Sequence, residues 1–421
     1  NITTAPTAWP APGQRLAHES LRPYPGRYGQ EVWKRWEDDP DCELDLPYYG
    51  FEQVVLTIGH ADQQHGHWRR WLRRQMPDAD GLIGPDNAMP TPGLQLGKLG
   101  QAWRTRLPEE LYPTRFIADQ TCATLARFAQ GDAPFFLQCS FPDPHHPFTP
   151  PGRYWDMFRP EDVSLPASFN AELVDPPPPV RYLREQRRAN PAFRPGHGSF
   201  ACSEPEAREA IALNHGNLAF VDDGIGRVMA QLRALGLDEN TVVLFTSDHG
   251  DLLGERGLMF KGGLHYPALT RVPFIWCDPA APAANASTAA LAQTIDIAPT
   301  VLTRAGLATA NGMQGRSLLP MIDGSQAQVR DELLIEEESQ RSDFGMDRRL
   351  RMRTLRDGNF RLTLYDGQPW GELCDLVQDP LELRNLWADP ASLALRRQLT
   401  EQLARAMMAA SDHSPYPHAA A

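Results

Sequence analysis

Two apolar runs, residues 135–141 and 241–247, break off abruptly into polar sequence, and they constrain the fold more than any other feature. Each run is apolar almost throughout, which is typical of a strand buried between two layers of helices. Apolar residues at helical spacing occur around them, over residues 116–130, 206–235 and 294–305. This alternation predicts an α/β fold with a mostly parallel central sheet flanked by helices.

The C-terminal part of the chain has a different pattern. Short strand patterns lie on either side of a turn signal at residues 356–359, and a helical pattern follows over residues 393–409. We therefore expect an α/β domain over residues 1–330 and a smaller C-terminal α+β subdomain over residues 331–421.

Charge and hydropathy narrow the functional class. The chain has 41 Lys and Arg against 53 Asp and Glu, a net charge of −12, which disfavours nucleic-acid binding because phosphate contact needs clustered cations. No run approaches about 18 consecutive apolar residues, so no transmembrane segment is expected. The 39 prolines predict long ordered loops, above all in residues 1–115 and 150–205, where we expect substrate selection to lie.

Polar residues follow both apolar runs at the point where each run ends. The first run leads into a segment that contains His145 and His146, and the second leads into the pair Asp248 and His249. If both strands run parallel in one sheet, their carboxyl ends share the edge at which open α/β sheets bind ligands. These side chains are therefore expected to converge on one site.

Two features near the second run suggest the ligands of that site. Asp248 and His249 offer a carboxylate oxygen and an imidazole nitrogen to one divalent cation, but hard cations take about six ligands or more, so the others must come from elsewhere. Lys261 precedes Gly262 and Gly263, and its ammonium suits a sulfate or phosphate anion. Taken alone, such a lysine is more often a surface residue.

Two further polar clusters are given structural interpretations. His60, His65 and His67 could bind metal, but they lack a Cys or carboxylate at ligand spacing and precede four arginines. A surface loop leading into a basic helix is therefore favoured. Asp222 and Asp223 lie within a helical pattern beside an apolar stripe, and the pair is interpreted as a solvated edge.

Four separated motifs carry a resemblance that covers most of residues 115–421. In chain order they are FFLQCSFPDPHHPFTPP, VVLFTSDHGDLLGERGLMFKGGLHYPALTRVPFIW, IDIAPTVLTRAG with GRSLLPMIDG, and GELCDLVQDPLELRNLWADP. In this order they resemble the sulfatase family of the alkaline-phosphatase-like superfamily. The resemblance implies an alkaline-phosphatase-like fold, a bound metal ion, a formylglycine nucleophile and a sulfate ester as the small-molecule substrate.

The resemblance also implies a role for each matching residue. Asp248 and His249 match metal ligands, most often of calcium, while a histidine-containing set also occurs in phosphonate and phosphodiester hydrolases that prefer manganese. His145, rather than His146, would stabilise or protonate the leaving-group oxygen. Lys261 would bind the sulfate oxygens and neutralise charge in the transition state. His265 is expected to touch the substrate.

The chain departs from the family at the nucleophile. Sulfatases need a Cys or Ser in a C-x-P-x-R pattern, which is converted to formylglycine, and this sequence has none. Residues 202–205 (CSEP) come closest, but they follow His145, whereas the family's nucleophile precedes that position. The family's early Asp-Asp metal pair and Gly-Lys-x-His segment are also missing. We therefore expect the nucleophile and half of the metal site on an N-terminal portion, or a second chain, that precedes Asn1.

Three functions follow from these motifs. The first is a sulfate ester hydrolase (an arylsulfatase-like enzyme) completed by that N-terminal portion. The second is a phosphonate monoester or phosphodiester hydrolase on the same scaffold. The third is a truncated, non-catalytic relative that binds anions or a partner. A polypeptide with a C-x-P-x-R pattern accompanying this chain would separate the first from the third.

Overall fold

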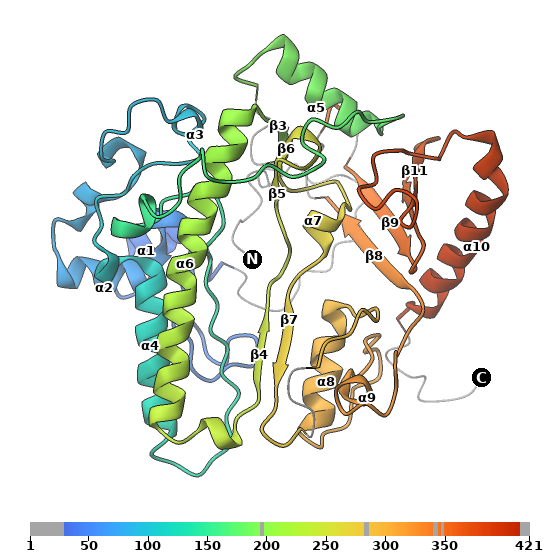
Figure 1. Cartoon of the computed structure of the whole chain (residues 1–421). Coiled ribbons are helices and arrows are strands. Elements are labelled where there is room, and N and C mark those ends of the chain that lie inside the picture. Colours follow the sequence, from blue (N-terminus) through green and yellow to red (C-terminus); the bar gives the residue numbers. More distant parts are fainter. Residues whose placement is uncertain (1–28, 194–197, 282–285, 340–343, 347–348, 413–421) are drawn as a thin grey trace, which may run out of the picture. The chain divides into compact units, whose positions relative to one another are not determined.

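A computed structural model describes residues 29–193, 198–281, 286–339, 344–346 and 349–412. The chain divides into two compact units, coloured by sequence in Figure 1. Unit 1 comprises Asn1–Ser164 and Pro205–Glu239, and unit 2 comprises Leu165–Glu204 and Asn240–Ala421. The predicted domain boundary near residue 330 stays a prediction.

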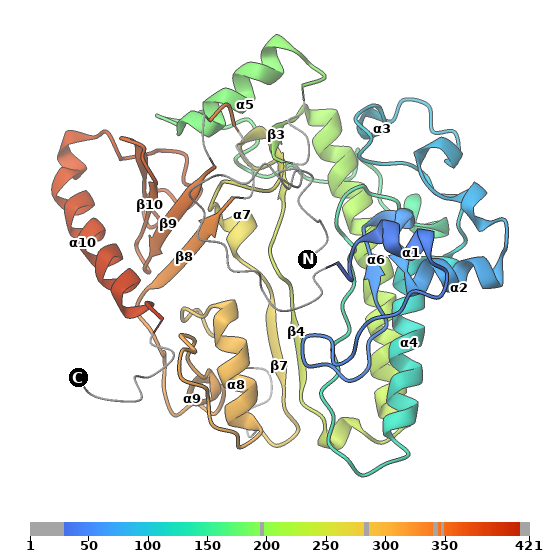
Figure 2. The ribbon, with the colours of Figure 1, turned by 180° about the vertical axis from the view of Figure 1, so that it is seen from behind.

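Unit 1 consists of helices joined by long ordered loops. Its helices are α1 (Trp33–Asp38), α2 (His67–Gln75), α3 (Gln95–Lys98), α4 (Pro113–Phe128) and all but the first residue of α6 (Glu204–Ala234), and its strands are β1 (Thr57–Ile58) and β2 (His65–Gly66). α4 and α6 run side by side in Figures 1 and 2. Arg227 on α6 contacts Asp119 on α4 at 2.7 Å, which ties the two helices together.

Local sequence explains the two long helices of unit 1. Pro113 lies in the first turn of α4, where the missing amide hydrogen costs nothing. The helix predicted over residues 206–235 is confirmed by α6, which ends just before Gly236 at a φ of +68°. The apolar faces of both helices meet a core that includes Trp68 and Phe220. No helix within the described ranges combines the length and apolar character that a membrane span requires.

The described part of unit 2 holds three sheets. The first has the order β3-β6-β5, the second pairs β4 with β7, and the third has the order β11-β10-β9-β8. The strands are β3 (Phe200–Ala201), β4 (Val243–Thr246), β5 (Leu252–Leu253), β6 (Leu258–Phe260), β7 (Phe274–Cys277), β8 (Leu333–Glu338), β9 (Arg351–Arg356), β10 (Phe360–Tyr365) and β11 (Gly371–Asp375). The helices are α5 (Pro178–Ala189), α7 (Pro267–Thr270), α8 (Ile297–Arg304), α9 (Leu319–Ile322) and α10 (Leu393–Ala409).

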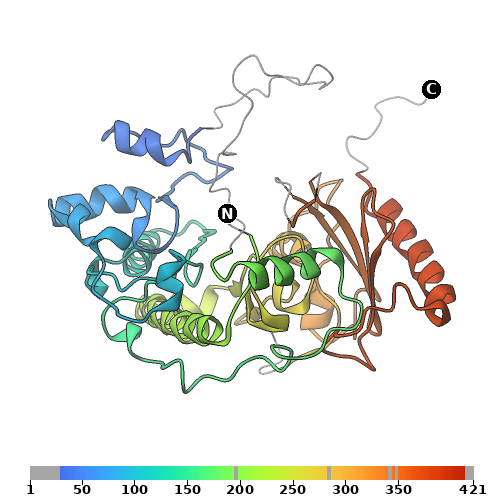
Figure 3. The same cartoon turned by 90° about the horizontal axis from the view of Figure 1, so that it is seen from above.

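The four-stranded sheet is an antiparallel meander covered by α10. The predicted turn at residues 356–359 joins β9 to β10, and the Asp357 carboxylate accepts the amides of Asn359 and Phe360 at 2.7 Å each. The predicted helix over residues 393–409 is confirmed by α10, which lies along the sheet in Figure 3. Leucines of the helix and the sheet form the core between them, namely Leu355, Leu362, Leu373, Leu399 and Leu403.

The mostly parallel central sheet is not found among the described strands. The strand predicted over residues 241–247 is β4, but it pairs with β7 in the antiparallel direction. Residues 135–141 belong to no helix or strand within the described ranges, and Phe136 is 67% exposed. An apolar run indicates that a segment suits a half-buried or buried strand. It does not indicate which neighbouring strand forms hydrogen bonds with it, or whether that neighbour runs parallel or antiparallel.

One prediction about the proline-rich stretch is wrong. Residues 150–205 were expected to form a loop, but they include α5. Pro178 and Pro179 occupy the first turn of this helix, where proline is tolerated because its fixed φ suits a helix start. The side chains of Val180 and Leu183 are then buried in the core of unit 2.

Candidate active site

The turn after β4 brings two predicted metal ligands together. Gly250 donates its amide to the carbonyl of Leu269 at 2.9 Å, and a Cβ atom there would meet the Ala268 carbonyl at 1.9 Å, so only glycine fits. His249 Nδ1 lies 2.8 Å from the Gly250 carbonyl and therefore carries the hydrogen of that bond. The lone pair of neutral His249 is then on Nε2, which lies 3.6 Å from Asp248 Oδ2.

This pair supplies only part of a metal site. A carboxylate oxygen and an imidazole nitrogen close together are suitable donors for a divalent cation. Within the part of the chain that the structure describes, however, no group of three or more His, Cys, Asp or Glu side chains could hold a metal ion. Asp248 and His249 can therefore supply some of the ligands of a metal site, but they do not complete the coordination of a metal ion by themselves.

Lys261 follows β6 and is positioned by the glycines behind it. Gly262 and Gly263 have φ values of +107° and +63°, and a Cβ atom on Gly263 would lie 2.2 Å from the ring of Phe344. The Nζ atom of Lys261 is buried, and no acceptor among the described residues is within hydrogen-bond distance of it. Burial lowers the pKa of this ammonium, while the charges of Asp251 and Asp248 act against that change.

Asp251 is a residue of this site that the sequence interpretation did not assign. Its Oδ1 atom is buried and has no hydrogen-bond donor among the described residues. Burial raises the pKa of its carboxyl, and the positive charges of Lys261 and His249 oppose that rise. The signal in the sequence was a second carboxylate directly after the Asp-His-Gly turn. Asp251 supplies a nearby negative charge that offsets part of the cost of burying Lys261, although it makes no hydrogen bond to that ammonium.

His265 is held in a buried hydrogen-bond network. It is 4% exposed, its Nδ1 lies 2.8 Å from Thr354 Oγ1, and its Nε2 lies 3.1 Å from Glu337 Oε2. Glu337 also accepts the amide of Gly263 through Oε1 at 3.1 Å. Both ring nitrogens thus contact protein groups, and one of these groups, Glu337, also holds the backbone next to Lys261. The predicted contact of His265 with substrate stays a prediction.

A cavity of about 1830 Å³ joins these residues within unit 2. Asp248, His249, Lys261, His265 and Glu337 all line it. The structure therefore brings together four of the five site residues predicted from the sequence. The fifth, His145, belongs to unit 1.

His145 lies in the turn that follows residues 135–141. Its backbone amide donates to the Pro142 carbonyl at 3.1 Å, and its Nδ1 donates to the carbonyl of His146. Because a carbonyl only accepts, Nδ1 carries the hydrogen, and Nε2 is the nitrogen that can exchange a proton. The ring stacks on that of His60, with centroids 3.6 Å apart and planes 9° apart, and also on that of His146 at 4.4 Å.

A buried carboxyl group supports the same turn. Asp143 Oδ2 accepts a hydrogen bond from the Thr114 hydroxyl on α4, and Asn214 on α6 donates to the Pro144 carbonyl at 3.4 Å. Burial raises the pKa of Asp143 to about 6, against the lowering effect of Thr114. The turn that carries His145 is therefore anchored to both long helices of unit 1.

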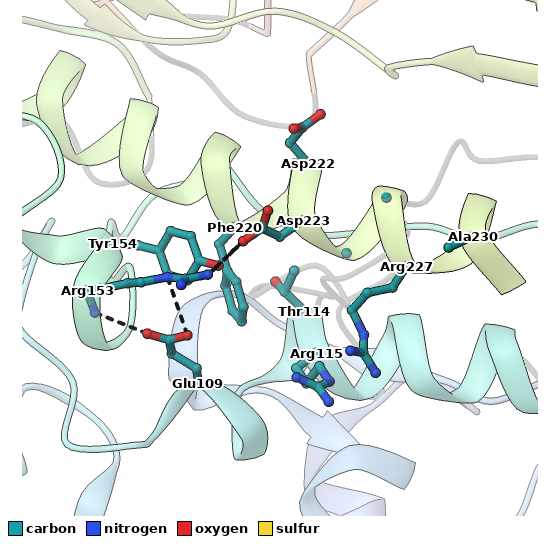
Figure 4. Close-up of a pocket in the computed structure, with 12 residues that line it drawn as sticks. Glu109, Thr114, Arg115, Arg153, Tyr154, Phe220, Asp222, Asp223, Arg227 and Ala230 are labelled. Atoms are coloured by element: carbon teal, nitrogen blue, oxygen red, sulfur yellow. Dashed lines mark hydrogen bonds and ion pairs between the residues drawn. The ribbon is translucent and has the colours of Figure 1, made fainter.

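A second cavity, of about 470 Å³, lies in unit 1, and none of the five predicted site residues lines it (Figure 4). Arg115, Arg153 and Arg227 line it, as does Asp223, whose carboxylate accepts the Tyr154 hydroxyl. Each of these arginines is already paired with a carboxylate at 2.9 Å or less. The sequence interpretation of Asp223 as part of a solvated edge agrees with its 53% exposed side chain.

Comparisons with known proteins cover most of the chain. Residues 49–307 match the family model described as Sulfatase, and residues 254–409 match that described as N-sulphoglucosamine sulphohydrolase, C-terminal. The chain is 30% identical over 312 residues to the multifunctional alkaline phosphatase superfamily protein PehA of Trinickia caryophylli. This alignment covers 71% of the chain and 60% of PehA. It is 28% identical over 356 residues to an arylsulfatase of Clostridium perfringens, covering 80% of the chain and 67% of that enzyme.

Among solved structures, the phosphonate monoester hydrolase of Agrobacterium radiobacter is similar with a TM-score of 0.69 and 25% identity. The likeness covers 90% of this chain and 77% of the hydrolase. In the two sequence alignments, the chain spans only about three fifths of the length of PehA and two thirds of the length of the arylsulfatase.

Proposed function

Because this chain belongs to the sulfatase family, we propose that it is the larger part of a metal-assisted sulfate ester hydrolase. The observation that carries the proposal is the buried ammonium of Lys261, which lines one cavity with Asp248 and His249. A buried cation without a hydrogen-bond partner among the described residues is costly unless an anion completes it. A sulfate group would supply the missing acceptors, and Lys261 would neutralise charge on its oxygens in the transition state.

The other site residues have complementary roles in this proposal. Asp248 and His249 would provide two ligands to a divalent cation, with calcium expected first and manganese as the alternative. That cation would add positive charge next to the sulfate oxygens. His145, as the imidazolium, would give the Nε2 proton to the ester oxygen as the bond from that oxygen to sulfur breaks.

The nucleophile, a formylglycine, is proposed to lie on polypeptide outside these 421 residues, together with the remaining metal ligands. The β4–β7 pair supports this part of the proposal. Phe245 and Ile275 are 40% and 58% exposed, and β7 is the only strand partner of β4 within the described ranges. An apolar strand with an open edge is a surface that proteins normally cover.

Turnover of an aryl sulfate tests the proposal. The protein isolated with all of its native polypeptide should hydrolyse 4-nitrophenyl sulfate, and Lys261→Met should lower kcat by about 10²–10³-fold. Lys98→Met changes a lysine whose side chain bonds Gln95 on the exposed surface of α3, and it serves as the matched control. Near-normal turnover by Lys261→Met would remove Lys261 from the anion site.

A phosphonate monoester or phosphodiester hydrolase is the second candidate. It is supported by histidine, rather than asparagine, at position 249 and by the structural likeness to the phosphonate monoester hydrolase. The ratio of kcat/KM for an aryl sulfate to that for an aryl phosphonate monoester decides between the two. Sulfate binding without turnover of either ester would instead favour a non-catalytic, anion-binding protein.

A further inference from the structure

We propose that His60 is a positioning residue for His145, an inference that rests on the leaving-group role proposed for His145. The two imidazole rings stack with centroids 3.6 Å apart and an interplanar angle of only 9°. A near-parallel stack at this distance is full van der Waals contact over the ring face. His60 would therefore fix the plane in which the His145 ring lies.

The segment that carries His60 is itself firmly held. His60 follows Gly59, which has a φ of +99°, and it precedes Asp62, which is fully buried. The Asp62 carboxylate accepts the indole of Trp103 at 3.1 Å and the hydroxyl of Thr105 at 2.6 Å. It also accepts the amide of Gly84 at 3.2 Å. A side chain on such an anchored turn can hold another ring in place.

The His60 stack is the closer of the two ring contacts described for His145 and helps determine where Nε2 of His145 points. The bond from Nδ1 to the His146 carbonyl holds one edge of the ring, and the His146 ring stacks on it at 4.4 Å with a tilt of 24°. The His60 ring lies closer and more nearly parallel, at 3.6 Å and 9°, and so limits the tilt of the His145 ring more strongly. The position of Nε2 matters because proton transfer to the leaving oxygen needs a separation of about 2.6–3.2 Å between the two heavy atoms. A displacement of about 1 Å can cost on the order of 10²-fold in rate.

The other two histidines of this segment have different partners. His65 Nδ1 lies 2.8 Å from Glu37 Oε1, and His67 Nε2 lies 3.0 Å from Glu43 Oε2. These two side chains join the segment to the neighbourhood of α1. His60 alone among the three has a ring contact with His145 in the described structure.

The stack can be measured without any turnover. In the 421-residue chain labelled with ¹³C at histidine Cε1, the His145 signal, assigned with His145→Gln, should be shifted upfield by the ring current of His60. His60→Ala should move it downfield, and His60→Phe, which keeps an aromatic face, should keep it upfield. If the chemical shift of His145 stayed unchanged in both variants, and both had wild-type melting temperatures, the inference would be overturned.

The consequence for catalysis is measured with a series of aryl esters that differ in the pKa of the leaving phenol. In the competent enzyme, His60→Ala should lower kcat by roughly tenfold or more for the poorest leaving group. It should hardly affect the best leaving group, and KM should stay constant. His60→Phe should restore most of the loss, and His215→Ala, an exposed histidine on α6, should change nothing.

A loss that is equal for all leaving groups would mean a general structural role and would overturn the inference. Failure of the proposed function is a different result. If the wild-type enzyme turned over none of the esters, the hydrolase assignment would fail. The ¹³C measurement would still decide whether His60 orients His145.

Discussion

The Nε2 atom of His265 lies 3.1 Å from Oε2 of Glu337, and the other oxygen of that carboxylate accepts the amide of Gly263. Glu337 belongs to β8 of the four-stranded sheet, whereas Gly263 follows Lys261 by two residues. One carboxylate therefore joins the C-terminal sheet to the backbone that presents the proposed sulfate-binding lysine. The sheet is part of the support of the site within unit 2.

Glu337→Ala should weaken both stability and turnover. It leaves the Gly263 amide and the His265 ring without their shared acceptor, which costs about 1–3 kcal/mol, and it loosens the segment that holds Lys261. Urea unfolding and kcat for an aryl sulfate measure the two effects. Glu336→Ala is the control, because that exposed residue forms a surface ion pair with Arg353 that contributes about 1 kcal/mol at most. Equal effects of the two substitutions would refute this role of Glu337.

Arg361→Met should be the most destabilising single change in the four-stranded sheet. Arg361 Nη2 lies 3.0 Å from Glu372 and 2.6 Å from Glu382, and all three side chains are almost fully buried. Removing the cation leaves two buried carboxylates without their partner, which typically costs about 3–5 kcal/mol. Arg351→Met, on neighbouring β9, breaks a fully exposed pair with Glu338 and should hardly change stability, because water and salt screen such a pair. Similar melting temperatures for the two variants would contradict the argument.

Asp143→Asn should change how stability depends on pH. The folded-state pKa of Asp143 is about 6, above its ordinary value of 3.8, because the carboxyl is buried. The folded state therefore binds this proton more tightly than the unfolded state does. The stability that the proton contributes is complete below about pH 4 and is lost as the pH rises through about 6. The difference of about two pK units corresponds to ~3 kcal/mol.

The asparagine variant carries no such proton. Relative to wild type, it should therefore gain stability between pH 4 and about pH 7, while Thr114 can still donate to the amide oxygen. Urea unfolding of both proteins across this range measures the difference directly. Parallel stability curves would show that Asp143 does not titrate in this way.

Asp248→Asn should weaken the stabilisation of the complete protein by calcium. A ligand that binds only the folded state raises the melting temperature according to its concentration and affinity. Loss of a carboxylate ligand lowers that affinity, so the calcium titration should shift to higher concentration. Asp222→Asn, an exposed carboxylate on α6, is the control, and the same titration with manganese identifies the preferred ion. An unchanged calcium response would remove Asp248 from the metal ligands.

Features encoded by local pattern were predicted well. The apolar spacing that gives α6 and α10, and the Asp357 turn between β9 and β10, depend on residues close in sequence. The resemblance to the sulfatase family is confirmed by the match over residues 49–307. The direction in which β4 pairs was beyond such patterns, because it depends on which distant segment lies alongside.

The same distinction applies to the site. Asp248, His249 and Lys261 were identified because they follow recognisable turns, and the structure places them around one cavity. Glu337 was missed because it lies 72 residues from His265 within an ordinary strand pattern. His60 was seen only as part of a histidine-rich loop, since nothing in the sequence says which ring stacks on His145.

Intact mass spectrometry of the native protein, under native and denaturing conditions, tests directly whether a formylglycine-bearing portion completes this chain. We predict polypeptide beyond these 421 residues, attached to them or released on denaturation. That polypeptide should contain a C-x-P-x-R segment with the mass deficit of a cysteine converted to formylglycine. A native protein that consists of this 47.0 kDa chain alone, with no such modification, would contradict the claim and leave an anion-binding protein in its place.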